Sequence, residues 1–161
     1  MIEPVDLESR TTRDDHLSLR LWLRLLACTN LVGARTRSRL RSEFATTMPR
    51  FDLLAQLERS PEGLRMSDLS QRLMVTGGNV TRIVDQLVDD GWVLRTASPD
   101  DRRSYTVRLT PKGRRAFTAM ALRHEEWIVE MFGGLSAKER AHLYALLAKL
   151  KAHAALEGDN R

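Results

Sequence analysis

The sequence contains a single cysteine and lacks any segment typical of a secretion signal or a membrane span. Cys28 has no partner for an intrachain disulfide and no second thiol with which to build a zinc site. Residues 1–15 carry several charges and have no apolar core of the kind that signal peptides need. No apolar run approaches the roughly 18 to 20 residues that a bilayer requires. We therefore expect a cytoplasmic protein that has no membrane partner.

The patterns of enzymes and metal sites are also missing. There is no phosphate-binding loop, no nucleophile elbow, no carboxylate pair in a cleft and no histidine–cysteine arrangement. Glu139 and His142 have a metal-like i, i+3 spacing, but Glu139 is already used at the start of a helix. His16 and His153 have no clustered partners. The sequence predicts neither enzyme activity nor a metal or cofactor.

Composition and charge favour a globular protein with an anionic partner. The 161 residues suggest one domain, residues 1–161, with 42% hydrophobic and 29% charged residues. The formal charge is +5, and its distribution is uneven. Between Arg65 and Arg115 ten lysines and arginines face six acidic residues, whereas the rest of the chain has sixteen against fifteen. This central stretch is therefore predicted to form the anion-facing surface.

Long amphipathic helices are expected at both ends of the chain. The first runs from Asp14 to about Ser42 and has two apolar arcs, so it needs two partners, its own core and a second subunit. A second helix opens at Thr110-Pro111, and Gly133-Gly134 breaks it. Ser136 and Glu139 then have the spacing of a capping box that starts the last helix.

Shorter elements fill residues 47–110. Thr47 is expected to cap a helix with Pro49 in its first turn, and Ser67 to cap a short helix, Asp68 to Leu73. Thr76 is expected to cap the next helix, which carries a clean apolar stripe and ends at Gly91. Two β-rich segments follow, Trp92 to Thr96 and Tyr105 to Leu109, joined by a charged turn. This order predicts a helix-turn-helix followed by a β-hairpin wing.

The order and spacing of these pieces resemble the MarR family of bacterial regulators. The resemblance rests on Leu69-Ser70-Gln71-Arg72-Leu73, on Thr76 through Val93, on Asp101-Arg102-Arg103 and on Leu109-Thr110-Pro111-Lys112-Gly113. It implies a mainly α fold with a small β-wing, a winged helix-turn-helix over residues 47–110. It also implies a homodimer that is joined through residues 14–45 and 111–156 and binds an operator in double-stranded DNA.

The predicted DNA-reading surface lies opposite the apolar stripe of the helix after Thr76. The start of such a helix enters the major groove, where Gly77 and Gly78 would let backbone N–H groups approach a phosphate. Asn79 suits adenine and Arg82 suits guanine, with Asp85 positioned to hold the arginine. The alternative is a solvated polar face. The predicted DNA contacts of this helix are Thr76, Gly77, Gly78, Asn79, Thr81, Arg82 and Gln86.

The wing and the next helix supply further basic residues. By resemblance to the family's wing motif, Arg103 lies in the minor groove beside Arg102, and Asp101 fixes the loop or the arginine. The alternative is a tip that serves only solubility. Lys112, Arg114 and Arg115 are interpreted as phosphate contacts or as solvated charges. In a twofold dimer the two lobes would reach half-sites about 34 to 36 Å apart, so the operator should be a pseudo-palindrome.

MarR-like regulators usually release DNA when a small anionic or aromatic molecule binds. Arg20 and Arg24 lie between the two apolar arcs of the first helix and would hold a carboxylate or phosphate. The alternative is that they pair with Glu125 or Glu126, or reach water. The apolar floor would come from Trp22, Phe51, His124 and Trp127, although His124 also fits a core histidine.

Residues 19–26 and 49–52, including Arg50, are similar to family members that respond to hydroxycinnamoyl-CoA thioesters. The effector would then be an aromatic acid or its CoA thioester. The arginines that follow would face CoA phosphates or form a solvated helix end: Arg35, Arg37, Arg39 and Arg41.

The sequence thus predicts a ligand-responsive transcriptional regulator, a repressor that an effector releases from DNA. One alternative is a winged-helix adaptor that binds proteins and reads no DNA. Another is a redox sensor based on Cys28, but its place on the apolar arc with Leu25 and Val32 favours a buried small hydrophobe.

Overall fold

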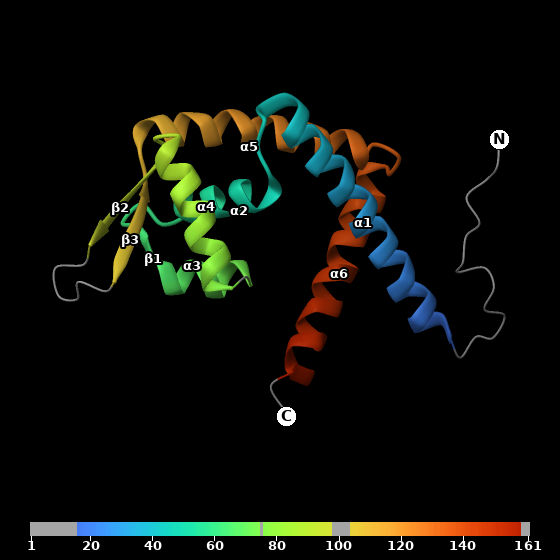
Figure 1. The fold of residues 1–161 in the computed structure, drawn as a ribbon. Helices are drawn as coiled ribbons and strands as arrows, with labels where there is room; N and C mark the ends of the chain where they lie inside the picture. Colours follow the sequence, from blue (N-terminus) through green and yellow to red (C-terminus); the bar gives the residue numbers. More distant parts are fainter. Residues whose placement is uncertain (1–15, 75, 98–103, 159–161) are drawn as a thin grey trace. The chain divides into compact units, whose positions relative to one another are not determined.

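The computed structural model describes residues 16–74, 76–97 and 104–158, and it is mainly helical with a small sheet (Figure 1). The elements follow in the order α1 (Leu17–Phe44), α2 (Met48–Glu58), β1 (Leu64–Arg65), α3 (Met66–Leu73), α4 (Gly77–Asp89), β2 (Val93–Ala97), β3 (Tyr105–Leu109), α5 (Pro111–Met131) and α6 (Ala137–Gly158). The predicted fold class, a winged helix-turn-helix with a small β-wing, is confirmed. The chain divides into two compact units, residues 1–124 and residues 125–161.

The core of the first unit joins α2, α3 and α4 to the sheet. Leu53 and Leu54 on α2, Leu69 on α3 and Val84 on α4 are fully buried. Full burial of such a side chain stabilises a fold by about 1.5–3 kcal/mol, so this apolar cluster fixes the helices to one another. Of the five residues in the stripe predicted for α4, Val80, Val84 and Leu87 are buried. Ile83 is half-buried, and Val88, near the end of the helix, is 38% exposed.

The sheet has three antiparallel strands in the order β1-β3-β2. Val93 pairs with Leu109 across the β2–β3 hairpin, and Leu64 pairs with Val107. The predicted hairpin is thus present, with β3 over the predicted residues and β2 displaced by one. Strand β1 was not predicted, because two residues are too short to show an alternating pattern.

The start of α3 was predicted wrongly. Ser67 does not cap it; the helix begins at Met66, and Arg65 stands at the cap position. The reason is β1: Leu64 and Arg65 pair with β3, and the chain passes from this bridge directly into the helix. Thr76 caps α4 as predicted, since its side chain accepts a hydrogen bond from the Asn79 N–H. Thr47 stands at the predicted position before α2, but its side chain makes no capping hydrogen bond.

Helix α1 buries little of its apolar surface within one chain. Its buried residues are Thr36 and Leu40, whereas Leu17, Trp22 and Leu31 are 66%, 56% and 65% exposed. Cys28 is exposed as well, so the expectation of a buried cysteine is wrong for the single chain. Leu25 and Val32 of the same arc are half-buried, so a single chain covers the predicted apolar arc only in part.

Among the described residues α1 is also the one helix that is long and apolar enough to cross a membrane by length and composition. The mean hydropathy of its most apolar segment is 1.2. The expectation that no apolar run is long enough to span a bilayer therefore holds only for uninterrupted runs, because Arg20 and Arg24 interrupt the apolar segment of α1. A single such helix near the N-terminus is weak evidence for a span.

The second unit holds the end of α5 and all of α6. The predicted capping box is formed: the Glu139 N–H donates to Ser136 Oγ at 3.3 Å, and the Ser136 N–H donates to Glu139 Oε2 at 2.7 Å. These hydrogen bonds lower the pKa of the Glu139 carboxyl below its ordinary value. Trp127 is buried at 2% exposure, whereas Tyr144 and Leu150 on α6 are 79% and 46% exposed.

Candidate nucleic-acid interface

The start of α4 presents bare backbone to solvent. Thr76 caps the helix, and its Oγ1 accepts a hydrogen bond from the Asn79 N–H at 3.4 Å. Gly77 and Gly78 are exposed, and a Cβ added at either would meet nothing within 4 Å. Neither glycine is therefore required for packing within this chain. Glycine at both positions leaves the backbone N–H groups at the start of α4 accessible to an anion such as phosphate.

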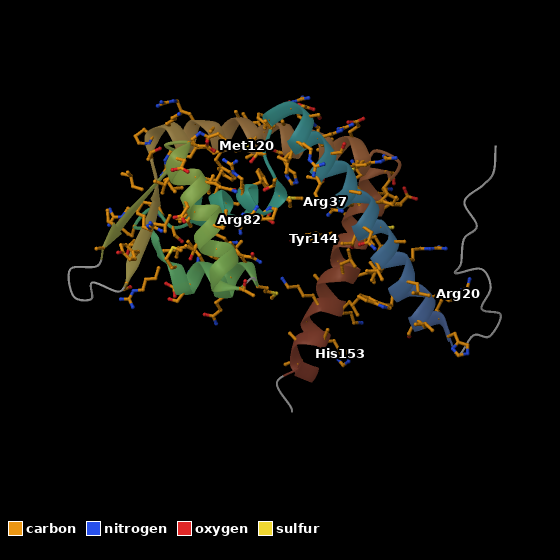
Figure 2. The ribbon with its side chains drawn as sticks, viewed as in Figure 1. Arg20, Arg37, Arg82, Met120, Tyr144 and His153 are labelled. Carbon is orange, nitrogen blue, oxygen red and sulfur yellow. The ribbon has the colours of Figure 1, made fainter. Side chains whose placement is uncertain are left out.

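The polar face of α4 is open along its length. Asn79, Thr81, Arg82 and Gln86 are all exposed, and Figure 2 shows Arg82 extending from α4. Thr81 Oγ1 donates to the Gly77 carbonyl oxygen at 3.0 Å, which satisfies its hydroxyl within the helix. The structure thus brings the predicted contacts of this helix together on one surface.

The sequence predicted that Asp85 holds Arg82 in place, but the structure shows a different partner for Asp85. Its carboxylate accepts a hydrogen bond from Arg95 Nη1 of β2 at 2.8 Å, and the Arg95 guanidinium lies 5.3 Å from the centre of the Tyr105 ring. This contact joins α4 to the wing. Arg82 consequently forms no ion pair with a described residue, and its guanidinium is available for a ligand. Arg95 was missed because its partner lies ten residues away on another element.

The predicted wing-tip contacts Asp101, Arg102 and Arg103 lie outside the described residues. Their role in the minor groove stays a prediction.

Two of the three basic residues at the start of α5 have partners within the chain. Lys112 Nζ donates to the Asp90 carbonyl oxygen at 2.8 Å, and Arg114 Nη1 donates to both carboxylate oxygens of Glu58 at 2.9 Å. The side chains of Lys112 and Arg114 thus make contacts within the chain and are not simply solvated charges. Arg115 is exposed.

The junction between β2, β3 and α5 is tightly packed. Thr110 Oγ1 donates to the Gly91 carbonyl oxygen at 2.7 Å and accepts from the Gly113 N–H at 2.9 Å. Gly113 lies against Trp92, and a Cβ there would be 1.9 Å from the Trp92 carbonyl oxygen. The Thr-Pro-Lys-Gly segment therefore fixes α5 to the residues that directly follow α4.

Arg50 belongs to this junction. Its guanidinium forms an ion pair with the Asp90 carboxylate and lies 5.4 Å from the centre of the Trp92 ring. Its side chain is only 16% exposed. Arg50 was predicted to bind an effector, but the structure commits it to the end of α4. Asp90 was not singled out from the sequence, although an acid at the C-terminal end of a helix opposes the helix dipole and so signals a cationic partner.

Of the predicted effector residues, the structure brings Phe51 and His124 together. Their ring centres are 5.0 Å apart, and the Phe117 ring lies 5.5 Å from that of Phe51. Beside them, partial desolvation raises the pKa of the Asp52 carboxyl, and the charge of His124 opposes this rise. This aromatic cluster joins α2 to α5.

The predicted effector residues of α1 form a separate group. Arg20 and Arg24 line a shallow hollow with Leu17 and Leu21, and no residue of α2 or α5 lines it. Figure 2 places Arg20 near the start of α1, and Arg37 further along the same helix. Of the four later arginines, Arg35, Arg37 and Arg41 are exposed and Arg39 is half-buried. Trp127 belongs to the second unit.

Among the described residues, no three His, Cys, Asp or Glu side chains gather closely enough to hold a metal ion.

Known proteins similar to this chain are regulators of transcription. A model of the MarR family matches residues 46–105, which span α2 to the first residue of β3. The HTH-type transcriptional regulator PecS of Dickeya dadantii is 28% identical over 130 residues, which are 80% of this chain and 78% of PecS.

Solved structures agree. A crystal structure of an E. coli MarR mutant aligns with a TM-score of 0.73 and 27% identity, over 81% of this chain and 95% of that one. An E. coli MarR mutant complexed with operator DNA aligns with a TM-score of 0.70 and 26% identity, over 86% and 99% of the two chains. Together with the open face of α4 and the Asp85–Arg95 contact between α4 and the wing, these findings show that residues 46–105 match the MarR family and that the chain is similar to its winged helix-turn-helix, DNA-binding transcriptional regulators.

Proposed function

We propose that the chain is a homodimeric repressor that binds a pseudo-palindromic operator and releases it when a small anionic aromatic molecule binds. The observation that carries the proposal is the start of α4, where two glycines leave the helix N–H groups open beside exposed Asn79 and Arg82. A phosphate at the helix start would fix the register, and the two side chains would read base edges. The relative complexed with operator DNA supports this use of the fold.

The dimer follows from the uncovered apolar surface of α1. Large apolar patches exposed on one chain are typical of protein interfaces, and a self-complementary patch favours a twofold pair. Residues 14–45 and 111–156 are the proposed dimerisation helices. A twofold pair presents two copies of α4, which is why the operator should be a pseudo-palindrome.

The effector is proposed to contact the aromatic cluster of Phe51, Phe117 and His124 with its ring. Because Arg20 and Arg24 line a separate hollow of α1, an anionic group that reaches them would have to be carried on a long ligand such as a CoA thioester. The aromatic rings offer an apolar, stackable surface for an aromatic acid or its CoA thioester, and the arginines suit a carboxylate or phosphate.

Operator binding is tested by selecting bound sequences from a random DNA library and then measuring affinity by fluorescence anisotropy. We expect a pseudo-palindromic consensus and an affinity that falls steeply with salt. Arg82→Ala should cost about 1–3 kcal/mol on the consensus site and relax its preference at one position of each half-site. No enriched sequence, with equal weak binding to every duplex, would reject the proposal and favour a protein-binding adaptor.

Effector release is tested separately by calorimetry with hydroxycinnamic acids and their CoA thioesters, followed by titration into the protein–DNA complex. We expect binding that lowers operator affinity. A compound that binds without weakening DNA binding would reject the proposed switch and leave operator recognition intact.

A further inference from the structure

Side chains of two other helices converge on the C-terminal end of α4. Arg50 of α2 pairs with the Asp90 carboxylate, and Lys112 of α5 donates to the Asp90 carbonyl oxygen at 2.8 Å. The Arg50 guanidinium also lies 5.4 Å from the centre of the Trp92 ring, just after the helix. We call Arg50, Asp90, Trp92 and Lys112 the α4 clasp.

The clasp is a built contact rather than a chance surface pair. The Arg50 side chain is 16% exposed, and its Nε is buried without a hydrogen-bond partner among the described residues. A guanidinium held in this way keeps its position through both an ion pair and a cation–π contact. The other described ion pairs of the first unit are more exposed at the arginine, for example Arg114 at 48%.

The clasp lies at the wrong end of α4 to read DNA. The helix runs from Gly77 to Asp89, and its open N-terminal end is about 18 Å from its last residue at 1.5 Å per residue. A tilt of about 5° around the clasp would move the start of the helix by roughly 1.5 Å over that length. Hydrogen bonds to base edges need heavy-atom distances of about 2.7–3.2 Å, so such a shift would break them.

We propose that the α4 clasp is a positioning device that holds the recognition helix α4 at the angle needed to read its operator, with Arg50 and Asp90 acting without touching DNA. The proposal rests on the operator binding proposed above. Contacts to phosphate tolerate small shifts better than base contacts do, because charge attraction varies slowly with distance. Loss of the clasp should therefore reduce sequence preference much more than general attraction to DNA.

The test compares the operator with a scrambled duplex across a range of salt concentrations. The variants are Arg50→Gln, Asp90→Asn and the double variant, with Arg123→Gln as the matched control because it breaks an α5–α1 ion pair, with Glu43, that does not involve α4. For each clasp variant we expect the ratio of operator to scrambled affinity to fall about tenfold. The slope of log affinity against log salt should stay at the wild-type value, since no phosphate contact is lost.

The double variant should lose no more than the worse single variant, because both changes remove the same contact. The control should keep the wild-type ratio. A slope smaller by about 0.9 in Arg50→Gln would show that Arg50 neutralises a phosphate and would overturn the proposal. An unchanged ratio, or single effects that add in the double variant, would overturn it as well.

The melting temperature of each variant shows whether a loss of operator preference comes from a general loss of structure. If Arg50→Gln fails to fold, Lys112→Met is used instead, because it removes the hydrogen bond from Lys112 to the Asp90 carbonyl oxygen. For this variant too we expect a lower ratio of operator to scrambled affinity and an unchanged salt slope. Wild-type protein without any operator preference would reject the proposed function, whereas variants that keep the wild-type preference would reject the clasp alone.

Discussion

Single residues in this protein are constrained by what lies within a few ångströms of them. Gly77 and Gly113 illustrate the contrast: a Cβ at Gly77 would meet open space, but one at Gly113 would overlap the Trp92 carbonyl. Glycine therefore leaves the backbone open to solvent at position 77, whereas at position 113 it permits close packing against the Trp92 backbone.

Gly113→Ala should destabilise the fold. The added Cβ would lie 1.9 Å from the Trp92 carbonyl oxygen, so the start of α5 must move away from the end of α4. Overpacking of this kind typically costs about 1–3 kcal/mol. Urea unfolding should show the loss, and Gly134→Ala, whose Cβ would meet nothing within 4 Å, should leave the midpoint nearly unchanged.

Asp52 should give the stability a measurable dependence on pH. Its pKa in the folded chain is raised above the ordinary value of 3.8, so the folded state holds the proton more tightly than the unfolded state does. The free energy of unfolding contributed by this group should therefore fall as the pH rises from about 3.8 through the folded pKa. Asp52→Asn should remove this component of the slope between pH 3 and pH 7. A variant whose pH profile matches the wild type would show that the carboxyl is not desolvated.

At the scale of elements, the recognition helix is fixed at three places. The Thr76 cap defines its start, the Asp85–Arg95 pair ties its middle to the wing, and the α4 clasp defines its end. The glycines at its start sacrifice helix stability, since glycine is less favourable than alanine in a helix by about 0.8–1.0 kcal/mol.

Gly78→Ala should separate stability from DNA binding. The fold gains helix propensity and meets no clash, so the melting temperature should stay equal or rise. The new methyl group would obstruct the approach of a phosphate to the helix N–H groups, so operator affinity should fall at least tenfold. A variant that binds as tightly as the wild type would contradict the assigned role of the bare backbone.

Much of this element order could be predicted from the sequence because each helix carries its own local signals. The stripe of α4, Thr76 before it and Gly91 after it were sufficient to define that helix. Strand β1 and the partners of Asp85 and Arg50 could not be predicted in this way. They depend on contacts between residues that are far apart in the chain, and only the assembled core brings such residues together.

At the scale of the whole molecule, the apolar surface of α1 is the main feature that one chain leaves unexplained. Leu17, Leu21 and Trp22 are all more than half exposed, at 66%, 52% and 56%. Exposed apolar area of this extent is costly in water and favours association.

Leu21→Glu should dissociate the proposed homodimer, because a charge would have to be buried within an apolar interface. Light scattering after size exclusion should give the mass of one chain for this variant and of two chains for the wild type. Ser38→Glu, at an exposed polar position of the same helix that lies outside both apolar arcs, is the control and should remain a dimer. A wild type that is monomeric at all concentrations would contradict the proposed assembly.

The uncovered face of α1 also links the lifetime of the protein to its copy number. In the proposed dimer, a newly made subunit would expose that face until it meets a second one, and the resistance of the protein to heat should rise with its concentration by mass action. In a cell with few copies, solitary subunits would be the form that proteases and chaperones encounter first.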